Sequence, residues 1–319
     1  MKTHTLLCLL LMPMSSTTVL AESSIEDQLN ECQGIEDSTQ RLSCYDNISA
    51  RQTAHIQQSG TRSDDPKPSA MPPFLADLNE PAVFVSFGEL DFLGNQPQAV
   101  LLGIGKRQAV KSFDWLDDRP PLTFNIHGLI RSQFDVEQLD TRNNRGGALI
   151  NTDFAVGGEL VQSLNNWNWR LSYTHRSTHL GDEFLLDNPE FADQRINLSY
   201  ETIQWQAHKP FGNWDIYAGL GLITRSEPGD LSEVMWQTGW QYQGATFADH
   251  FKPLWAVDLT TWGAYDWNIN INMRAGVEIA NLAQLPIQVY FEYFDGHSPY
   301  GQFYTEDLSY AGITIMQHW

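Results

Sequence analysis

Residues 167–184 contain a histidine and a serine whose spacing suits nucleophilic chemistry. The segment reads WNWRLSYTHRSTHLGDEF, in which one residue separates His175 from Ser177. In an extended strand the two side chains project from the same face, with their Cα atoms about 6.7 Å apart. A serine hydroxyl that donates to a histidine nitrogen is the core of many hydrolase sites, because the imidazole takes the proton when the oxygen attacks. We therefore predict His175 as the base and Ser177 as the nucleophile.

The strand face that carries this pair is otherwise apolar. Its earlier members are Trp167, Trp169, Leu171 and Tyr173. If these side chains face lipid, strand parity places His175 and Ser177 against lipid as well, where the available acyl ester is a phospholipid. The alternative is that the pair lies among the lipid headgroups, where polar and aromatic side chains mix at little cost and no catalysis is implied.

The alternation of apolar and polar residues continues from residue 81 to the end of the chain. In WNININMRAGVEI (267–279) one strand face is entirely apolar. Several runs hold the pattern for about ten residues, whereas strands in globular proteins most often run about 5 to 6. Brief turns alternate with long polar loops, which is typical of outer-membrane proteins. These features predict an all-β fold, a closed antiparallel transmembrane β-barrel.

We expect about twelve strands, with ten as the alternative because the first two and the ninth alternate least clearly. The expected ranges are 82–90, 98–106, 121–136, 147–162, 166–178, 194–208, 212–224, 233–246, 254–262, 266–280, 285–295 and 306–318. With the amino terminus in the periplasm, odd strands run outward, so the fifth carries His175 and Ser177 to the outer leaflet. The last strand leads to Trp319, and a terminal aromatic residue resembles the signal that the barrel-assembly machinery reads in outer-membrane proteins.

The sixth strand is expected to turn its apolar residues outward. Ile196, Leu198 and Tyr200 would then face lipid, and Asn197 would face the lumen. Charged residues of both signs are expected in the lumen: Arg131, Asp153, Glu159, Arg170, Arg176, Arg195, Glu201, Arg225, Arg274, Glu278 and Glu292. Because a barrel of this size has little open space once such side chains pair, we predict a closed, salt-bridged interior instead of a general porin. A narrow channel is the alternative.

The beginning of the chain predicts export. Residues 1–21 have the apolar run and the small terminal residues of a secretory signal peptide, and the run is shorter than the roughly 20 residues of a membrane-spanning helix. The formal net charge of -20 argues against nucleic acid as a partner. We place the mature protein in the outer membrane of a Gram-negative bacterium.

Two cysteines define a small unit before the barrel. In residues 22–55, Cys32 lies at helical spacing with Ile25 and Leu29, and Cys44 with Arg41 and Ile48. This pattern predicts a disulfide-stapled helical hairpin in the periplasm, with zinc binding as the alternative. Residues 56–73 are rich in turn-forming residues and predict a linker. The barrel is then expected to occupy residues 74–319.

The spacing His175-Arg176-Ser177 on a lipid-facing strand resembles outer-membrane phospholipase A. In that family of twelve-stranded barrels the His-x-Ser pair lies on the outer face and is completed by an asparagine elsewhere in the barrel. The resemblance implies hydrolysis of phospholipid acyl esters, with outer-membrane lipids as partners. The chain departs from the family after the serine, where Thr178-His179 replaces Asn-Gly. An alternative role for His179 is to bind a metal together with His175.

The loop after the fifth strand supplies candidates for a third catalytic residue and for calcium. Asn188 is the expected third member, with Asp187 and Asp182 as alternatives. The same resemblance implies Ca²⁺ near this loop and activation as a homodimer. Asp182, Glu183 and Asp187 are then the candidate ligands, with Asp182 and Glu183 expected to hold the ion. A solvated acidic loop without metal is the alternative.

Two further segments resemble a proteobacterial envelope family known only as a domain of unknown function. These segments are FLADLNEP (74–81) and HRSTHLGDEF (175–184). The resemblance implies a barrel and no particular activity. Two functions therefore remain: a lipid-facing serine hydrolase of phospholipase A type, and a non-enzymatic barrel with a structural, binding or narrow-channel role.

Overall fold

A computed structural model of the chain describes two separate units. The described residues are 32–35, 37, 40–45, 71–114, 120–136, 147–191, 198–229, 231, 234–248, 250–279 and 286–318. The two units divide between Ser63 and Asp64. The predicted signal peptide, most of the predicted linker and residues Arg195, Ile196, Asn197 and Trp319 lie outside the described residues.

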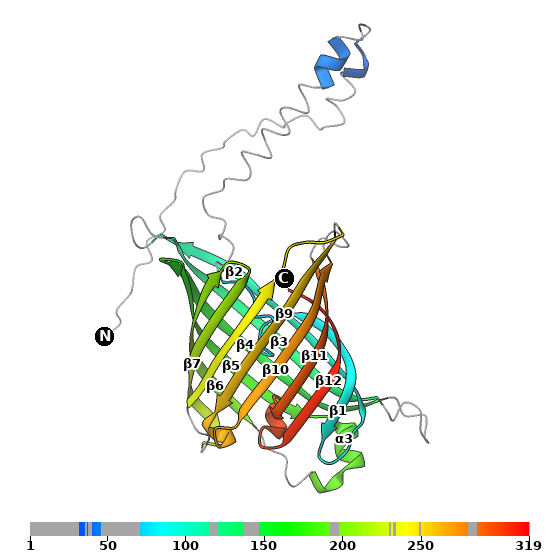
Figure 1. The fold of residues 1–319 in the computed structure, drawn as a ribbon, viewed down its shortest axis with the longest axis vertical. Coiled ribbons are helices and arrows are strands. Elements are labelled where there is room, and N and C mark those ends of the chain that lie inside the picture. Colours follow the sequence, from blue (N-terminus) through cyan, green and yellow to red (C-terminus); the bar gives the residue numbers. More distant parts are fainter. Residues whose placement is uncertain are drawn as a thin grey trace, which may run out of the picture. The chain divides into compact units, whose positions relative to one another are not determined.

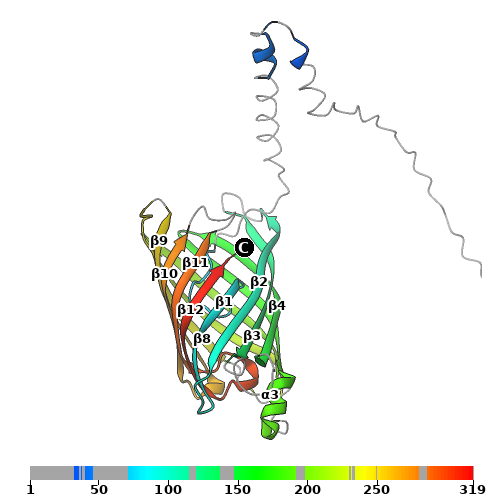
Figure 2. The ribbon, with the colours of Figure 1, turned by 90° about the vertical axis from the view of Figure 1, so that its right-hand side faces the viewer.

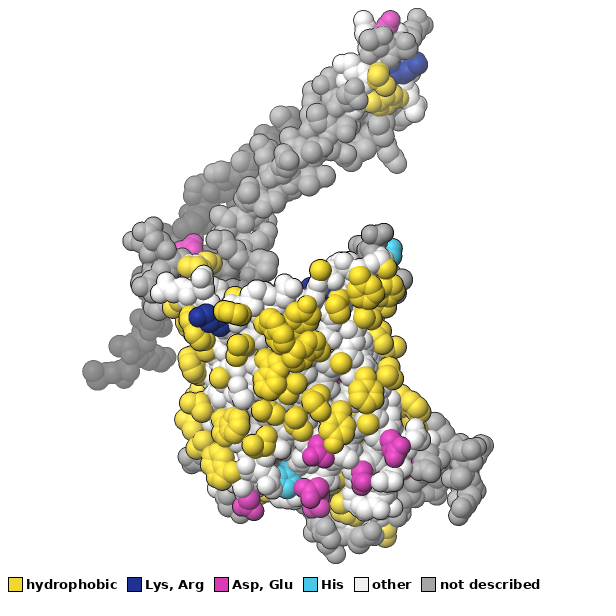
Figure 3. Space-filling view, in the orientation of Figure 1, with side chains coloured by type: hydrophobic (Ala, Val, Ile, Leu, Met, Phe, Trp, Pro, Cys, Tyr) yellow, Lys and Arg dark blue, Asp and Glu magenta, His cyan; other side chains and the backbone are white. Residues whose placement is uncertain are grey.

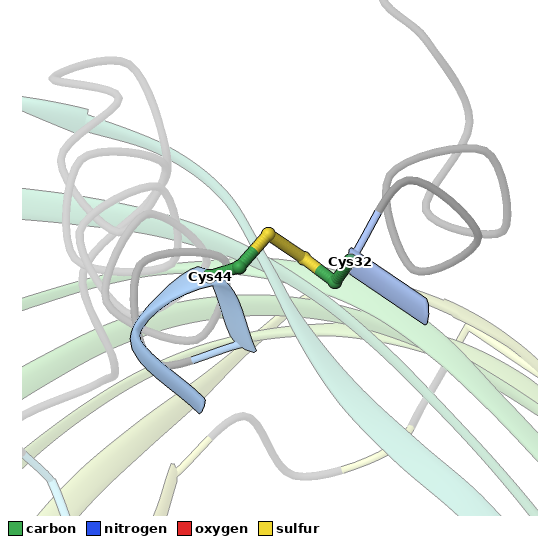
Figure 4. The surroundings of a disulfide bond; sticks show 2 residues. All are labelled: Cys32 and Cys44. Atoms are coloured by element: carbon green, nitrogen blue, oxygen red, sulfur yellow. A yellow bond between two sulfur atoms is a disulfide. The ribbon is translucent and has the colours of Figure 1, made fainter. Parts of the chain in front are cut away.

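The first unit contains the predicted disulfide. Helical residues lie on both sides of the bond, at 32–33 and 40–45, and the Cα atoms of Cys32 and Cys44 are 5.7 Å apart (Figure 4). The Asp37 carboxylate accepts a hydrogen bond of 2.9 Å from the Gln40 amide, which caps the second helical stretch. Within the described part of the chain, no helix is long and apolar enough to cross a membrane.

The second unit is a closed antiparallel barrel of twelve strands (Figures 1 and 2). The strands are β1 (Val83–Phe92), β2 (Gln98–Phe113), β3 (Leu122–Asp135), β4 (Ala148–Leu164), β5 (Trp167–Leu180), β6 (Ser199–Phe211), β7 (Trp214–Glu227), β8 (Val234–Gln243), β9 (Phe251–Trp262), β10 (Ile269–Ile279), β11 (Ile287–His297) and β12 (Asp307–Gln317). The prediction of twelve strands is confirmed, and the alternative of ten is wrong. Each strand pairs with its sequence neighbour, and β1 closes the barrel against β12 from Val83↔Gln317 to Phe92↔Leu308.

The two ends of the barrel differ. One end, which we call the terminal end, carries the start of β1, the end of β12 and two-residue turns such as 165–166. Asn165 and Asn166 have φ values of 50° and 65°, as a tight hairpin turn of this kind requires. The other end, which we call the loop end, carries α3 (Asp182–Asp187), η2 (Pro189–Phe191), η3 (Gly263–Tyr265) and η4 (Gly301–Phe303).

The outer wall of the barrel is apolar. Large hydrophobic side chains remain exposed on every part of it, for example Leu220 at 60%, Phe291 at 54% and Ile313 at 51%. Figure 3 shows them spread over the wall, with acidic side chains toward the end that carries α3. Such a surface is stable in contact with lipid and unstable in contact with water.

The lumen is filled by the chain itself. Residues 71–82, which we call the lumen segment, precede β1 and lie inside the barrel, where Phe74, Leu75 and Ala76 are fully buried. Inward-facing polar side chains hold the backbone of this segment: Gln241 of β8 accepts from the Leu75 amide at 2.8 Å, and Arg274 of β10 donates to the Leu75 carbonyl at 2.6 Å. The Phe74 ring stacks on Tyr217 of β7 with 3.8 Å between centroids.

Buried ion pairs surround the lumen segment. Glu80 of the segment pairs with Arg107 of β2 and with Arg170 of β5, and Glu159 of β4 also pairs with Arg107 at 2.6 Å. On the opposite side Arg274 pairs with Glu292 of β11 at 2.7 Å. The predicted closed, salt-bridged interior is therefore correct, and the lumen segment completes it.

Two apolar clusters lie in the lumen near the loop end, beside buried polar residues such as Asn151 and Thr178. Leu198, Ile223 and Trp262 form one buried cluster there, and Phe184 of α3 packs with Phe303 of η4 in another. Between these clusters and the lumen segment lies a polar cavity of about 110 Å³. This volume holds a few water molecules and is far smaller than an aqueous channel.

Replacing Arg274 by methionine should destabilise the barrel by about 3–5 kcal/mol, because Glu292 would remain buried without its partner. The Leu75 carbonyl would also lose its donor. Unfolding by urea in lipid vesicles measures the change. Lys209→Met, which alters an exposed cation of β6, is the matched control and should cost less than about 1 kcal/mol. Equal stability of the two variants would contradict the role assigned to the Arg274 pair.

Glu80 should make the stability of the barrel depend on pH. Burial alone raises the pKa of the Glu80 carboxyl, but Arg107 and Arg170 outweigh this effect and lower the pKa from 4.5 to about 2. A lowered pKa means that the contribution is complete above pH 4.5 and is lost as the pH falls toward 2. The difference in unfolding free energy between wild type and Glu80→Gln should therefore shrink over this window. A difference that stays constant with pH would contradict the ionised state of Glu80.

Candidate functional site

His175 and Ser177 lie on the outer face of β5, close to the loop end. Along this strand Arg170, Ser172, Thr174 and Thr178 are buried in the interior, while the alternate residues face outward. The predicted parity of the fifth strand is therefore confirmed. On β4 the residue opposite His175 is Val156, and the residue opposite Ser177 is Phe154.

A carboxylate of the neighbouring strand holds the imidazole. Glu201 of β6 lies directly opposite His175 in the sheet register. Its Oε1 atom is 3.1 Å from Nδ1 of His175, which is hydrogen-bonding distance. The Glu201 side chain is 14% exposed and that of His175 is 43% exposed, so the contact lies at the edge of the lipid-facing surface and not in open water. With a proton on Nδ1, Nε2 is left as the basic nitrogen.

The sequence-based orientation of the sixth strand is wrong. Leu198 is buried in the lumen cluster, and Tyr200 packs against it. In contrast, Ile203 and Trp205 are exposed, so Glu201 shares their outward face. The error has a physical cause. At the loop end part of the lumen is lined by apolar side chains, so apolar character there does not indicate contact with lipid.

Ser177 is next to the histidine but is not bonded to it. Its hydroxyl makes no hydrogen bond to His175 within the described residues; the two side chains share one groove on the outer wall. On β6 the residue opposite Ser177 is Ser199. Catalytic hydrogen bonds are often long or absent without substrate and tighten only in the complex, so the missing bond does not by itself argue against catalysis.

The groove beside the pair is apolar, and we call it the outer groove. It crosses β2 to β5 and is lined by Ile104, Ile130, Phe154 and Val156. Its floor includes Gly128 of β3, which faces outward between Ile126 and Ile130. A Cβ atom at Gly128 would meet only the Ala155 carbonyl oxygen, at 3.7 Å, so the space above this glycine is open. A hydrocarbon chain fits such a surface better than a polar group does.

Within the described residues, none of the loop residues that the sequence suggested is hydrogen-bonded to His175. Asn188 follows α3, and its side-chain amide donates to the Phe184 carbonyl at 3.0 Å. No hydrogen bond in the described structure joins Asn188 to His175. Asp182 and Glu183 are exposed in the first turn of α3. Asp187 is the last residue of that helix.

The described residues do not form a metal site. No group of three or more His, Cys, Asp or Glu among them is close enough to hold a metal ion. The ring of His179 packs edge-on against Phe154, with 5.7 Å between centroids. The exposed pair Asp182 and Glu183 does not fit the six to eight oxygen ligands that Ca²⁺ takes. We therefore derive no catalytic step through calcium.

Sequence reasoning missed Glu201, although one signal was available. Glu201 lies in the series Glu201, Ile203, Trp205, whose last two members are large and apolar. Parity counted from the middle of the strand would have placed Glu201 outward. Taken together, an outward serine, histidine and glutamate on two adjacent strands have the composition of a hydrolase triad.

Comparisons with known proteins identify a family and a fold. Residues 121–319 match the family described as "Protein of unknown function (DUF1207)". No curated protein matches the chain.

Solved structures of outer-membrane phospholipase A share the architecture. The enzyme from Escherichia coli aligns with a TM-score of 0.54 at 9% identity, over 76% of this chain and 92% of that one. The dimer from Salmonella typhi with bound calcium aligns with a TM-score of 0.52 at 11% identity, over 79% of this chain and 93% of that one. At these identities the likeness concerns the fold.

Proposed function

The chain belongs to the DUF1207 family, and we propose that it is an outer-membrane serine hydrolase that cleaves acyl esters of phospholipids. The observation that carries the proposal is the hydrogen bond of 3.1 Å between Glu201 and His175, beside Ser177 on the outer face of the barrel. A carboxylate that fixes a histidine next to a serine is the arrangement that activates a hydroxyl. The apolar surroundings make a lipid the available ester.

The proposed reaction has two halves. In the first, Oγ of Ser177 bonds to the acyl carbon, Nε2 of His175 takes the hydroxyl proton, and the same nitrogen returns it to the alcohol oxygen as the ester bond breaks. In the second, water attacks the acyl carbon and gives a proton to Nε2 of His175, and that nitrogen returns the proton to Oγ of Ser177 as the bond between the acyl carbon and Oγ breaks, which releases the fatty acid. Glu201 accepts from Nδ1 throughout and stabilises the imidazolium that forms in each half.

The membrane orientation follows the loop lengths. Short turns lie at the periplasmic side of outer-membrane barrels and longer loops outside, so we assign the terminal end to the periplasm. The disulfide unit of Cys32 and Cys44 would then be periplasmic, and the site on β5 would meet the outer leaflet. We also propose that the barrel-assembly machinery recognises the last strand and its Trp319.

The alternative function is a barrel without catalysis. The absence of a hydrogen bond between Ser177 and His175 in the described structure favours it, because a relaxed pair at the headgroup level needs no partner. The filled lumen supports a structural or lipid-binding role over a narrow channel. Fatty-acid release from phospholipid micelles separates this alternative from the hydrolase.

Purified protein in micelles of a diacyl phospholipid should release fatty acid, and Ser177→Ala should abolish the release. Glu201→Ala should lower kcat by about 10²–10⁴-fold, because the imidazole loses its orienting partner. Glu201→Gln should retain more activity, since an amide oxygen still accepts from Nδ1. The released fatty acid is quantified by mass spectrometry.

Ser199→Ala is the matched control, because Ser199 faces outward opposite Ser177 on the next strand. It should leave kcat within about two-fold of wild type. Equal release by wild type and Ser177→Ala, or no release by either, would refute the hydrolase and leave the non-catalytic barrel.

We also propose, from the likeness to outer-membrane phospholipase A, that the hydrolysis depends on calcium and that the protein forms a dimer. The calcium-bound dimer of phospholipase A from Salmonella typhi motivates both. Fatty-acid release in EDTA against release in Ca²⁺, together with the mass of the detergent-solubilised protein, tests them.

Filling the outer groove should select against long acyl chains. Gly128→Phe would place a ring on the open floor between Ile126 and Ile130, so kcat/KM for long-chain esters should fall by about ten-fold while short-chain esters are cleaved as before. Gly128→Ala is the control, because its methyl group meets nothing closer than 3.7 Å. A uniform loss with both chain lengths would show that the groove is not the acyl site.

A further inference from the structure

An extra residue interrupts the pairing of β6 and β7 next to Glu201. Thr202 pairs with Ile223 and Glu201 pairs with Arg225, so Thr224 has no opposite residue. Thr224 instead donates its hydroxyl to the Glu201 carbonyl at 3.3 Å. This arrangement is a β-bulge, a feature that is frequent beside functional sites because it redirects a side chain.

The bulge reverses the direction of Arg225. Ile223 points into the lumen, where it is buried with Leu198. Regular alternation would send Arg225 to the same side as Ile223, which is the orientation that the sequence suggested. Because of the bulge Arg225 is opposite the outward-facing Glu201, and its side chain is exposed. The inward assignment of Arg225 is therefore wrong.

Arg225 completes a row of three ionisable residues across the outer wall. The register runs from His175 through Glu201 to Arg225 on three consecutive strands. Glu201 is hydrogen-bonded to His175. Within the part of the chain that the structure describes, no hydrogen bond or ion pair engages the Arg225 side chain. A guanidinium directed at the membrane surface without a protein partner is available to a ligand.

The depth of Arg225 fits a lipid headgroup. β7 ends at Glu227, two residues farther toward the loop end. At the edge of a barrel wall, an outward side chain meets the polar layer of the membrane. The planar guanidinium matches phosphate oxygens with two parallel hydrogen bonds, which a neutral side chain cannot make.

We propose that Arg225, turned outward by the β-bulge at Thr224, binds the phosphate of a membrane lipid next to the site on β5. This inference rests on the proposed function for its role, since bound phosphate would fix the position of the ester relative to Ser177. It makes Arg225 a determinant of specificity for phosphate-bearing lipids over neutral esters.

Two substrates test the role in specificity. With phosphatidylglycerol micelles, Arg225→Gln should lower kcat/KM by about ten-fold to one hundred-fold, because a charge-assisted contact is lost. With a diacylglycerol of the same chains, the variant should match wild type within about two-fold. Arg225→Lys should recover part of the loss. Lys209→Gln, an exposed cation of the same outer wall at the terminal end, is the matched control and should affect neither substrate.

A binding measurement keeps the inference testable if no hydrolysis occurs. Native mass spectrometry counts the phosphatidylglycerol molecules that the intact barrel retains, and Arg225→Gln should retain fewer than Lys209→Gln. Free inorganic phosphate at millimolar concentration should not displace the lipid; displacement would show a site for the free anion. Equal retention by the two variants, or an equal loss of activity on both substrates, would overturn the assignment. If only the proposed hydrolase is wrong, Arg225→Gln should still retain fewer lipid molecules than Lys209→Gln, while no variant releases fatty acid.

Discussion

Closure of the sheet between β1 and β12 is the constraint on which the rest of the structure depends. A strand in hydrocarbon must pair its backbone on both sides, and a closed sheet satisfies that requirement for all twelve strands. Closure also leaves each side chain only two directions, toward lipid or toward the lumen. On β5 this rule separates Arg176 and Thr178 from His175 and Ser177, although the four residues are consecutive.

The lumen and the outer wall therefore divide the polar chemistry of the chain between them. Inside, carboxylates and guanidinium groups satisfy one another and hold the lumen segment, so that little space remains for a solute. The polar groups of β5 to β7 that face outward have no such network. Glu201 is hydrogen-bonded to His175, and Arg225 lies opposite Glu201 with its side chain exposed.

The sequence predicts the architecture well because the polar lumen and the lipid outside differ in polarity along most of each strand. Alternation in segments such as 267–279 is enough to locate strands and their outward faces. The alternation pattern misleads where the lumen itself is lined by apolar side chains. Leu198 and Tyr200 enclose an apolar part of the lumen, so their hydrophobicity pointed to the wrong side and hid the outward position of Glu201. The bulge at Thr224 is not visible in the amino-acid sequence. The outward direction of Arg225 follows only from the strand register in the structure.

The position of the lumen segment restricts the order in which the barrel assembles. Residues 71–82 come before the first strand, but the side chains that grip their backbone include Gln241 of β8 and Arg274 of β10. The segment that is synthesised first in this unit therefore binds to strands that are synthesised late. Enclosure of the segment before β12 pairs with β1 would satisfy this order, because a closed barrel offers no easy way in. The segment that fills the lumen would then also serve as a template around which the strands close.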